Sequence, residues 1–200
     1  MATTQVVGPR KKLRKSARKS ATPLEDEVAQ AIFDLEVNNK SLKPVLQPLY
    51  VNTAKEVDIG HGKRAVVIFS PLRFLKKFHR IHKQLTAELE KKFSGKQVLV
   101  IGQRKITRQG KHNKNKIPRT RTAVSVRENI LADLLYPVDV VGRRWRHKTD
   151  GSKQTKIFLD AREKDKVEGK IEAISVVYKK LTGVDASFGF MTNPLLQQFQ

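Results

Sequence analysis

The chain has 200 residues, 38% of them hydrophobic, which suits one globular domain with basic extensions. Its 41 Lys and Arg against 19 Asp and Glu give a formal net charge of +22, and such a charge favours a polyanionic partner such as a nucleic acid. The lack of cysteine excludes disulfide-stabilised folds and thiolate zinc sites, and it fits an intracellular protein better than a secreted one.

The segment 1–22 is predicted to be a basic tail. Its run RKKLRKSARKS, at residues 10–20, holds seven basic residues and no acidic one, so we expect it to be disordered unless it is bound. Two interpretations stand side by side, a solvated tail or an arm for nucleic acid or nuclear import, and the charge density favours the arm. The candidate RNA contacts in this tail are Arg10, Lys11, Lys12 and Arg14.

The first predicted helix begins at Pro23, because Thr22 can cap it and Glu25 follows the cap by three residues. This helix is acidic, so we expect it to face solvent or another protein rather than phosphate. After it, residues 50–69 are predicted to form a hairpin that reverses near 60–62. The second arm of that hairpin, 65–69, is apolar on both faces, as an internal strand requires.

A long amphipathic helix is predicted to follow Pro71, with apolar residues three or four apart and a basic outer face. Ser94 and Gly95 end it, and a second strand that is apolar on both faces follows at 98–101. Strand, helix and strand form a crossover unit, so the two strands are expected to be parallel.

The loop at 104–121, RKITRQGKHNKNKIPRTR, holds eight basic residues and no acidic one. It has glycine and asparagine but no helical periodicity, so it can follow an irregular phosphate path and fold on contact. A DNA major groove is more often read by a rigid helix, and the loop therefore favours structured RNA. The candidate contacts are Arg104, Lys105, Arg108, Lys111, Lys114, Lys116, Arg119 and Arg121.

A shorter helix is predicted at 126–135, followed by a hairpin at 138–159 that turns at Asp150-Gly151. The hairpin is basic in both arms. Trp145 lies among its arginines, and the pattern leaves open whether it anchors the hairpin or stacks on a base. The candidate RNA contacts are Arg143, Arg144, Arg146, Lys148, Lys153 and Lys156.

A last helix at 167–181 is predicted to end at the C-cap glycine Gly183, and residues 185–190 can add an edge strand. Together these elements predict an α+β (mixed α/β) fold with a single central sheet, helices packed on it, and the basic loop and hairpin extending from it. The predicted domain spans 23–190, a C-terminal tail follows at 191–200, and no internal repeat is visible in the sequence.

We found no nucleotide-binding glycine motif, nucleophile elbow or metalloprotease motif in the sequence. We therefore expect no enzyme, cofactor, metal, small-molecule substrate or membrane partner. Two alternatives remain: a nuclear, chromatin-associated DNA-binding protein, and, least favoured, an RNA-processing enzyme that uses dispersed carboxylates such as Asp133, Asp139 and Asp160.

The run LTAELEKKFSGK at 85–96 resembles the signature of the eukaryotic small-subunit ribosomal protein seven family. Further stretches are similar to the same family over about residues 24–190, namely IGQR at 101–104, ILADLLYP at 130–137, VVGRRWRHKTDGSK at 140–153 and VYKKLTG at 177–183.

The resemblance implies a structural protein of the small (40S) subunit that binds 18S rRNA and neighbouring ribosomal proteins and contributes to subunit assembly and translation. It also implies a cytoplasmic, ribosome-bound protein with a nucleolar stage during assembly, without catalysis or cofactor. The family's RNA contacts carry over as expectations for the basic loop and for the hairpin at 140–156, and the acidic first helix is the candidate for protein contact.

Overall fold

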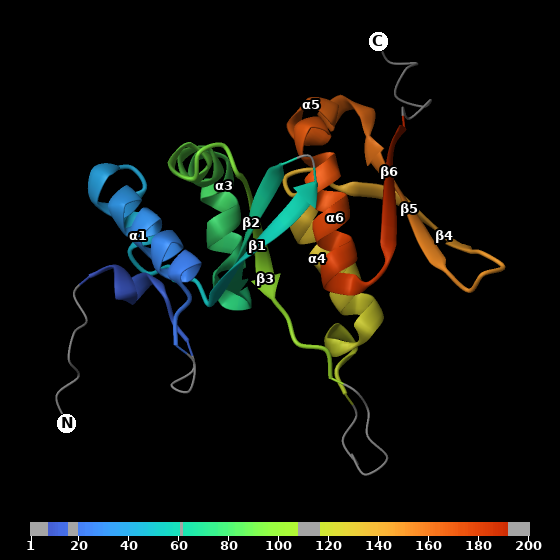
Figure 1. Cartoon of the computed structure of the whole chain (residues 1–200), viewed down its shortest axis with the longest axis horizontal. Coiled ribbons are helices and arrows are strands. Elements are labelled where there is room, and N and C mark those ends of the chain that lie inside the picture. The colour runs from blue at the N-terminus through green and yellow to red at the C-terminus, as the bar shows by residue number, and fades with distance from the viewer. Residues whose placement is uncertain (1–7, 16–19, 61, 108–116, 192–200) are drawn as a thin grey trace. The chain divides into compact units, whose positions relative to one another are not determined.

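The structure, a computed structural model, describes residues 8–15, 20–60, 62–107 and 117–191. The chain forms two compact units, Met1–Arg104 and Lys105–Gln200, and each has its own sheet (Figure 1). The single domain predicted at 23–190 spans both units, and its boundaries stay a prediction. Parts of the predicted N-terminal tail, most of the C-terminal tail and the middle of the basic loop lie outside the described residues.

The first unit contains a three-stranded sheet with the strand order β1-β2-β3. Strands β1 and β2 are antiparallel, and β3 lies parallel to β2 after a crossover through α3, as the sequence predicted. The elements of this sheet are β1 (Thr53–Gly60), β2 (Lys63–Pro71), α3 (Leu72–Lys92) and β3 (Gln97–Gln103).

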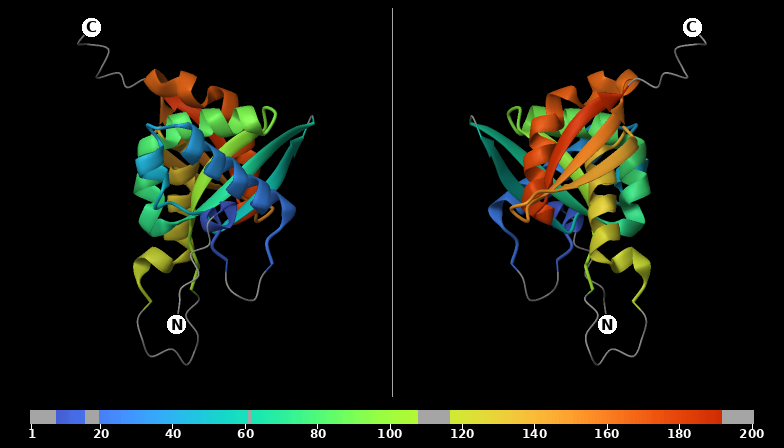
Figure 2. Two further views of the ribbon diagram at one scale, coloured as in Figure 1. Left: turned by 90° about the vertical axis from the view of Figure 1, so that its left-hand side faces the viewer. Right: turned by 90° about the vertical axis from the view of Figure 1, so that its right-hand side faces the viewer.

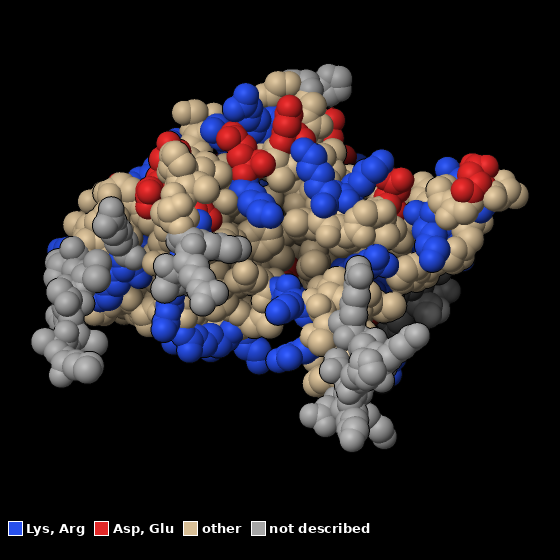
Figure 3. All heavy atoms as spheres, turned by 60° about the horizontal axis from the view of Figure 1, so that its bottom comes forward, with Lys and Arg blue, Asp and Glu red and all other residues tan. Residues whose placement is uncertain are grey.

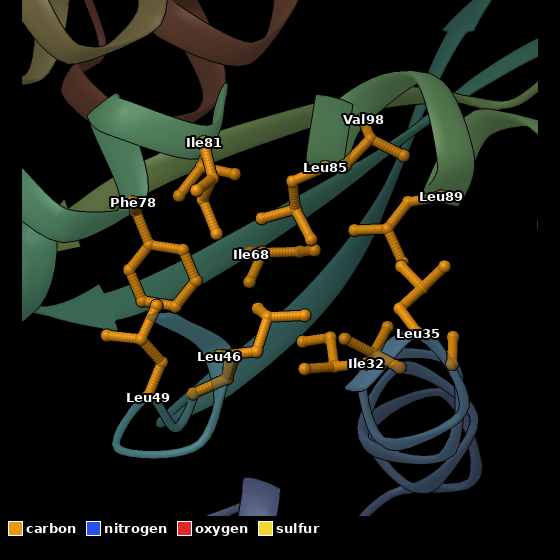
Figure 4. Packing of buried hydrophobic residues seen from close by; sticks show 14 of the residues in the cluster. Ile32, Leu35, Leu46, Leu49, Ile68, Phe78, Ile81, Leu85, Leu89 and Val98 are labelled. Carbon is orange, nitrogen blue, oxygen red and sulfur yellow. The ribbon is translucent and has the colours of Figure 1, made fainter. Parts of the chain in front are cut away.

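The core of the first unit forms between its sheet and two helices. Strand β2 is buried from residue 65 to residue 68, which confirms the prediction of an internal strand. Helix α3 places Phe78, Leu85 and Leu89 on β2 and β3, and α1 (Pro23–Asn38) adds Ile32 and Leu35 (Figure 4). Because burial of one such side chain contributes about 1.5–3 kcal/mol, this cluster holds the unit together.

The predicted disorder of the N-terminal tail is wrong for residues 8–15. A 3-10 helix, η1 (Pro9–Lys12), packs against α1, and Leu13 forms a parallel bridge with Val51. Lys12 is 1% exposed, and its Nζ donates to the carbonyl of Leu46 at 2.6 Å, at the end of α2 (Lys43–Leu46). The same Nζ forms an ion pair with Glu36 of α1. A buried cation with these partners fixes the segment in place.

The second unit begins with η2 (Arg119–Arg121) and α4 (Ala123–Leu135) and contains a second three-stranded sheet with the strand order β4-β5-β6. Strands β4 and β5 are antiparallel, and β6 is an edge strand parallel to β5. The strands of this sheet lie in front of α4 in the right-hand view of Figure 2. The remaining elements are β4 (Val140–His147), β5 (Lys153–Asp160), η3 (Ala161–Glu163), α5 (Lys164–Val167), η4 (Glu168–Lys170), α6 (Ile171–Thr182) and β6 (Asp185–Met191).

The α+β class is confirmed, but the single central sheet is corrected to two sheets. In each unit a helix precedes an antiparallel hairpin, and a second helix then returns the chain to place a third strand parallel to the second. The crossover helix thus brings each third strand back to its own hairpin, so the two hairpins never share a sheet. The described elements repeat one topology although the sequence shows no repeat.

The last predicted helix is shorter than expected. It begins at Ile171 instead of Val167, because α5 and η4 interrupt the helical pattern around Gly169. Glycine is a poor helix former, so a break at this position fits the sequence. The C-cap prediction is confirmed, since Gly183 has a φ of 71°, in the left-handed region that favours glycine.

Candidate nucleic-acid interface

The hairpin β4–β5 is built around a tight turn. Gly151 has a φ of 75°, and the backbone N–H groups of Gly151 and Lys148 donate to the carbonyls of Lys148 and Ser152, each at 3.0 Å. The Asp-Gly pair identified in the sequence is therefore the turn. Strand β4 is exposed from Arg143 to its end at His147, so its side chains project from the fold instead of filling it.

The register of the hairpin divides its basic residues between two faces. Arg144 lies opposite Lys156, and Arg146 lies opposite Gln154. Because strand side chains alternate, these residues share one face of the sheet. We call this the outer face; its residues are Gly142, Arg144, Arg146, Gln154, Lys156, Phe158, Asp185, Ser187 and Gly189.

The opposite face of the sheet is turned toward the core of the second unit. It carries the buried side chains of Thr155, Ile157 and Leu159. Arg143 lies on this side as well and forms an ion pair with Glu128 of α4 at 3.0 Å. Of the predicted hairpin contacts, Arg143 is thus the one whose charge is already matched within the fold.

The other five hairpin cations are exposed and have no carboxylate within ion-pair distance among the residues that the structure describes. They are Arg144, Arg146, Lys148, Lys153 and Lys156. Like charges this close repel one another, so the cluster raises the positive potential at the end of the hairpin and attracts anions. Figure 3 shows that basic side chains are also spread over other parts of the face it draws.

The basic loop is described only at its two ends. Lys105, Arg119 and Arg121 are exposed, the latter two in η2, and the guanidinium of Arg104 donates to the carbonyl of Gly102 at 3.3 Å. The backbone N–H of Thr107 donates to the carbonyl of Arg121 at 3.1 Å, which brings the two ends of the segment 107–121 together. The predicted contacts Arg108, Lys111, Lys114 and Lys116 lie outside the described residues.

The N-terminal candidates for RNA contact differ in their exposure and partners. Lys12 is corrected: its ammonium is buried on its own carbonyl and carboxylate partners, so a phosphate cannot reach it. Lys11 is exposed, and the side chain of Arg10 lies outside the description. Arg14 is exposed, and its guanidinium lies 5.5 Å from the centre of the Tyr50 ring.

The acidic helix α1 is matched largely within the chain. Glu25 and Glu36 form ion pairs with Lys15 and Lys12, and Asp34 pairs with Lys92 at 2.7 Å. Burial works to raise the pKa of Glu25, but hydrogen bonds from Lys15 and Thr22 outweigh burial and hold it below its usual value of 4.5. Two of the acidic residues expected to meet another protein or solvent thus meet the chain's own N-terminal segment, and a third meets α3.

Sequence reasoning missed Phe158, whose partly exposed ring lies on the outer face between basic residues. The signal was present, because Gln154, Lys156 and Phe158 alternate along β5 and must share one face. Trp145, which was singled out instead, is 47% exposed and lies on the other face, so it is not a buried anchor of the hairpin.

Gly62, at the hairpin reversal predicted near 60–62, borders an open hollow of about 550 Å³ in the first unit. Lys63, Arg64 and Lys96 line it. The charges of the last two are partly matched, because Glu56 lies 3.5 Å from Arg64 and 2.9 Å from Lys96. The hydrogen bond from Lys96 lowers the pKa of Glu56, which keeps this carboxylate charged beside the hollow.

Within the described ranges, the structure contains no group of three or more His, Cys, Asp or Glu residues placed to hold a metal ion. None of the helices in the same ranges is long and apolar enough to cross a membrane.

The comparisons with known proteins agree with the resemblance in the sequence. The family described as "Ribosomal protein S7e" matches residues 12–190. A "Small ribosomal subunit protein eS7z" of Arabidopsis thaliana is 48% identical over 180 residues, which cover 90% of this chain and 94% of the relative.

Two relatives from other lineages give similar values. A "Small ribosomal subunit protein eS7" of Dictyostelium discoideum is 48% identical over 185 residues, 90% of this chain and 95% of its own. One of Schizosaccharomyces pombe is 42% identical over 178 residues, 86% and 91% of the two chains. With a family match across most of the chain and relatives this similar along nearly their whole length, the chain belongs to the ribosomal protein S7e family.

Proposed function

We propose that this protein is a structural component of the small (40S) ribosomal subunit that binds 18S rRNA, with the hairpin β4–β5 and the basic loop as its main RNA contacts. Neighbouring ribosomal proteins are its other partners, and it acts in subunit assembly and translation. The relatives that share its family are named as proteins of the small ribosomal subunit, which supports this proposal.

We infer the RNA contact from the five hairpin cations, which have no acidic partner among the described residues. Each cation that meets a phosphate releases condensed counterions, so several of them together give strong, salt-sensitive and sequence-tolerant binding. Of the predicted hairpin contacts, only Arg143 has an ion pair among the described residues, with Glu128 of α4. The positive charge of the hairpin is therefore left for a partner.

The basic hairpin suits shape-based recognition of folded RNA better than recognition of a DNA sequence. A DNA reader commonly inserts a helix with base-contacting side chains into the major groove. Here the five unmatched hairpin cations lie on strands β4 and β5 and in the turn between them, and the described cations of the basic loop lie at its ends. Together with family membership, this favours the ribosomal function over the chromatin alternative, and we propose no catalytic role.

In the cell we expect the protein on cytoplasmic ribosomes, after a nucleolar stage in which the subunit is assembled. The experiment compares two tagged variants for incorporation into 40S particles on sucrose gradients. One carries Arg144→Gln, Arg146→Gln and Lys156→Gln. The matched control replaces Lys91, Lys164 and Lys166 by Gln, because each of these lysines already pairs with a glutamate, at 3.0, 3.2 and 2.5 Å.

We expect the hairpin variant to enter 40S particles several-fold less well than the wild type and the control to enter them normally. Equal incorporation of all three would contradict the role of the hairpin. Association with chromatin but not with ribosomal particles would instead favour the DNA-binding alternative.

A further inference from the structure

We propose that the outer face of the second sheet is a stacking site for an unpaired RNA base, with Phe158 as its platform. This inference rests on the proposed RNA-binding function and names the chemistry of one contact. It adds to the phosphate contacts a group that binds the base itself, and hence a preference for single-stranded over fully paired RNA.

The two cross-strand partners of Phe158 place no side chain on its ring. Gly142 of β4 and Gly189 of β6 are its partners in the two registers. A Cβ atom added at Gly142 would lie 3.7 Å from Cδ2 of the ring, and one added at Gly189 would lie 3.8 Å from Cδ1. Any longer side chain at these two positions would therefore pack on the ring, and glycine at both keeps it accessible.

Cations surround the same ring. The guanidinium carbon of Arg144 and the Nζ of Lys156 lie 5.7 and 5.5 Å from its centre, within the range of cation–π contact. Arg146 projects from the same face about 7 Å further along β4. A base stacked on Phe158 would therefore have its flanking phosphates within reach of exposed cations.

An RNA base fits this site better than an apolar segment of a protein. A protein side chain that covered Phe158 would also cover Arg144 and Lys156, which have no acidic partner among the described residues, and burial of unmatched cations is costly. A nucleotide brings an aromatic face for the ring and a phosphate for the cations. Because the ring lies on the face of a sheet, it can stack only on a base that has left its own helix.

The test measures binding of the full chain to two RNA probes at one fixed salt concentration: a single-stranded oligouridine and a fully paired RNA duplex of the same length. Because the basic tail and loop can bind the phosphates of both probes, the informative quantity is the ratio of the two affinities. Three proteins are compared, namely the wild type, Phe158→Leu, which keeps an apolar side chain, and Phe158→Tyr, which keeps the aromatic ring.

We expect Phe158→Leu to weaken oligouridine binding by roughly fivefold or more while duplex binding stays unchanged, because stacking on an aromatic side chain contributes at this level. Phe158→Tyr should bind both probes like the wild type. Equal binding of oligouridine by the Leu variant and the wild type would overturn the stacking site and leave the proposed function intact. A wild type that binds neither probe would instead remove the proposed function, and the stacking site with it.

A second measurement does not depend on the Leu variant folding normally. In a Trp145→Phe, Phe158→Trp protein the single tryptophan reports on the platform. Oligouridine should quench its fluorescence and the paired duplex should not. Equal quenching by the two probes, or none by oligouridine, contradicts the inference.

Discussion

The hairpin β1–β2 of the first unit and the hairpin β4–β5 of the second occupy equivalent places in two sheets of the same topology. Strand β2 is buried from residue 65 to residue 68, on both of its faces. Strand β5 buries only Thr155, Ile157 and Leu159, and its other face carries Lys156 and Phe158. The central strand of the first hairpin is thus buried in the core, whereas one face of the second hairpin is exposed.

The cations around α1 and those of the hairpin β4–β5 also differ in their partners. In the first unit, Lys12, Lys15 and Lys92 each pair with a carboxylate of α1. In the second unit, five cations of the hairpin have no such partner among the described residues. The charges of Lys12, Lys15 and Lys92 therefore stabilise the fold, whereas those of the hairpin are left for a partner, which shows that composition alone does not separate structural from functional lysines.

The largest expected effect is on the buried cation of the first unit. Lys12→Met leaves Glu36 and several carbonyls without their partner, so we expect the free energy of unfolding to fall by about 3–5 kcal/mol. Urea unfolding combined with hydrogen exchange of the first unit measures it. The control is Lys11→Met at the exposed neighbour, with a change within about 0.5 kcal/mol. Similar small changes in both variants would show that Lys12 is not part of the core.

Substitutions in the two central strands, β2 and β5, should differ almost as much in their effect on the free energy of unfolding. Ile68→Ala in β2 removes a side chain that is 1% exposed and lies in the core cluster, so a loss of about 2–5 kcal/mol is expected. Lys156→Ala in β5 removes an exposed side chain and should cost about 1 kcal/mol or less. Thermal or urea unfolding of the two variants measures these losses. Comparable losses of stability in both would contradict the distinction between the hairpins.

The difference in free charge can be measured through salt. Replacing Arg144, Arg146 and Lys156 by Gln should lower the slope of log affinity against log salt for single-stranded RNA by roughly 2, because each phosphate contact contributes about 0.7. Replacing Lys91, Lys92 and Lys96 of the first unit, which pair with Glu88, Asp34 and Glu56, should leave the slope nearly unchanged. A reversed order would place the RNA contact in the first unit.

The smallest expected effect is the pH dependence of the first unit. The pKa values of Glu25, Asp34 and Glu56 are lowered in the folded chain, Asp34 chiefly through its hydrogen bond from Lys92. A carboxyl with a lowered folded pKa contributes stability above its unfolded value, and that stability is lost as pH falls through the folded pKa. We therefore expect the first unit to lose stability below pH 4.5.

Because Asp34 and Glu56 are partly exposed and burial of Glu25 opposes the lowering of its pKa, the total loss should be on the order of 1 kcal/mol. Urea unfolding between pH 6 and pH 3 measures the loss. A variant with Glu25→Gln, Asp34→Asn and Glu56→Gln should give a flatter curve. If the triple variant keeps the full pH dependence, other carboxyl groups are responsible.

Much of each unit was predictable because its signals are local. The cap at Thr22, the apolar spacing along α3 and the Asp-Gly turn each depend on neighbouring residues, and each element appeared where it was predicted. The parallel pairing of β2 and β3 was also predictable, since a strand–helix–strand unit leaves few alternatives. The basic hairpin and the ends of the basic loop are exposed, as their charge requires.

Other features depend on contacts between residues far apart in the chain. Lys12 looked like the other cations of its run, and only its position against Glu36 and the carbonyl of Leu46 makes it a core residue. Phe158 looked like an ordinary strand residue, and the glycines beside it lie 16 and 31 positions away in sequence. No local pattern indicates such pairings, because they arise when strands come together in a particular register.

The sequence by itself determined the helices, the turns, the excess of positive charge and the family, since each of these depends on residue type and short-range spacing. The tertiary structure alone decided that there are two sheets, which cations are matched within the fold, and which face of the second sheet carries Phe158 with its cations. The physical reason is that burial and ion pairing depend on which segments meet in space, and that depends on strand register and crossover connections.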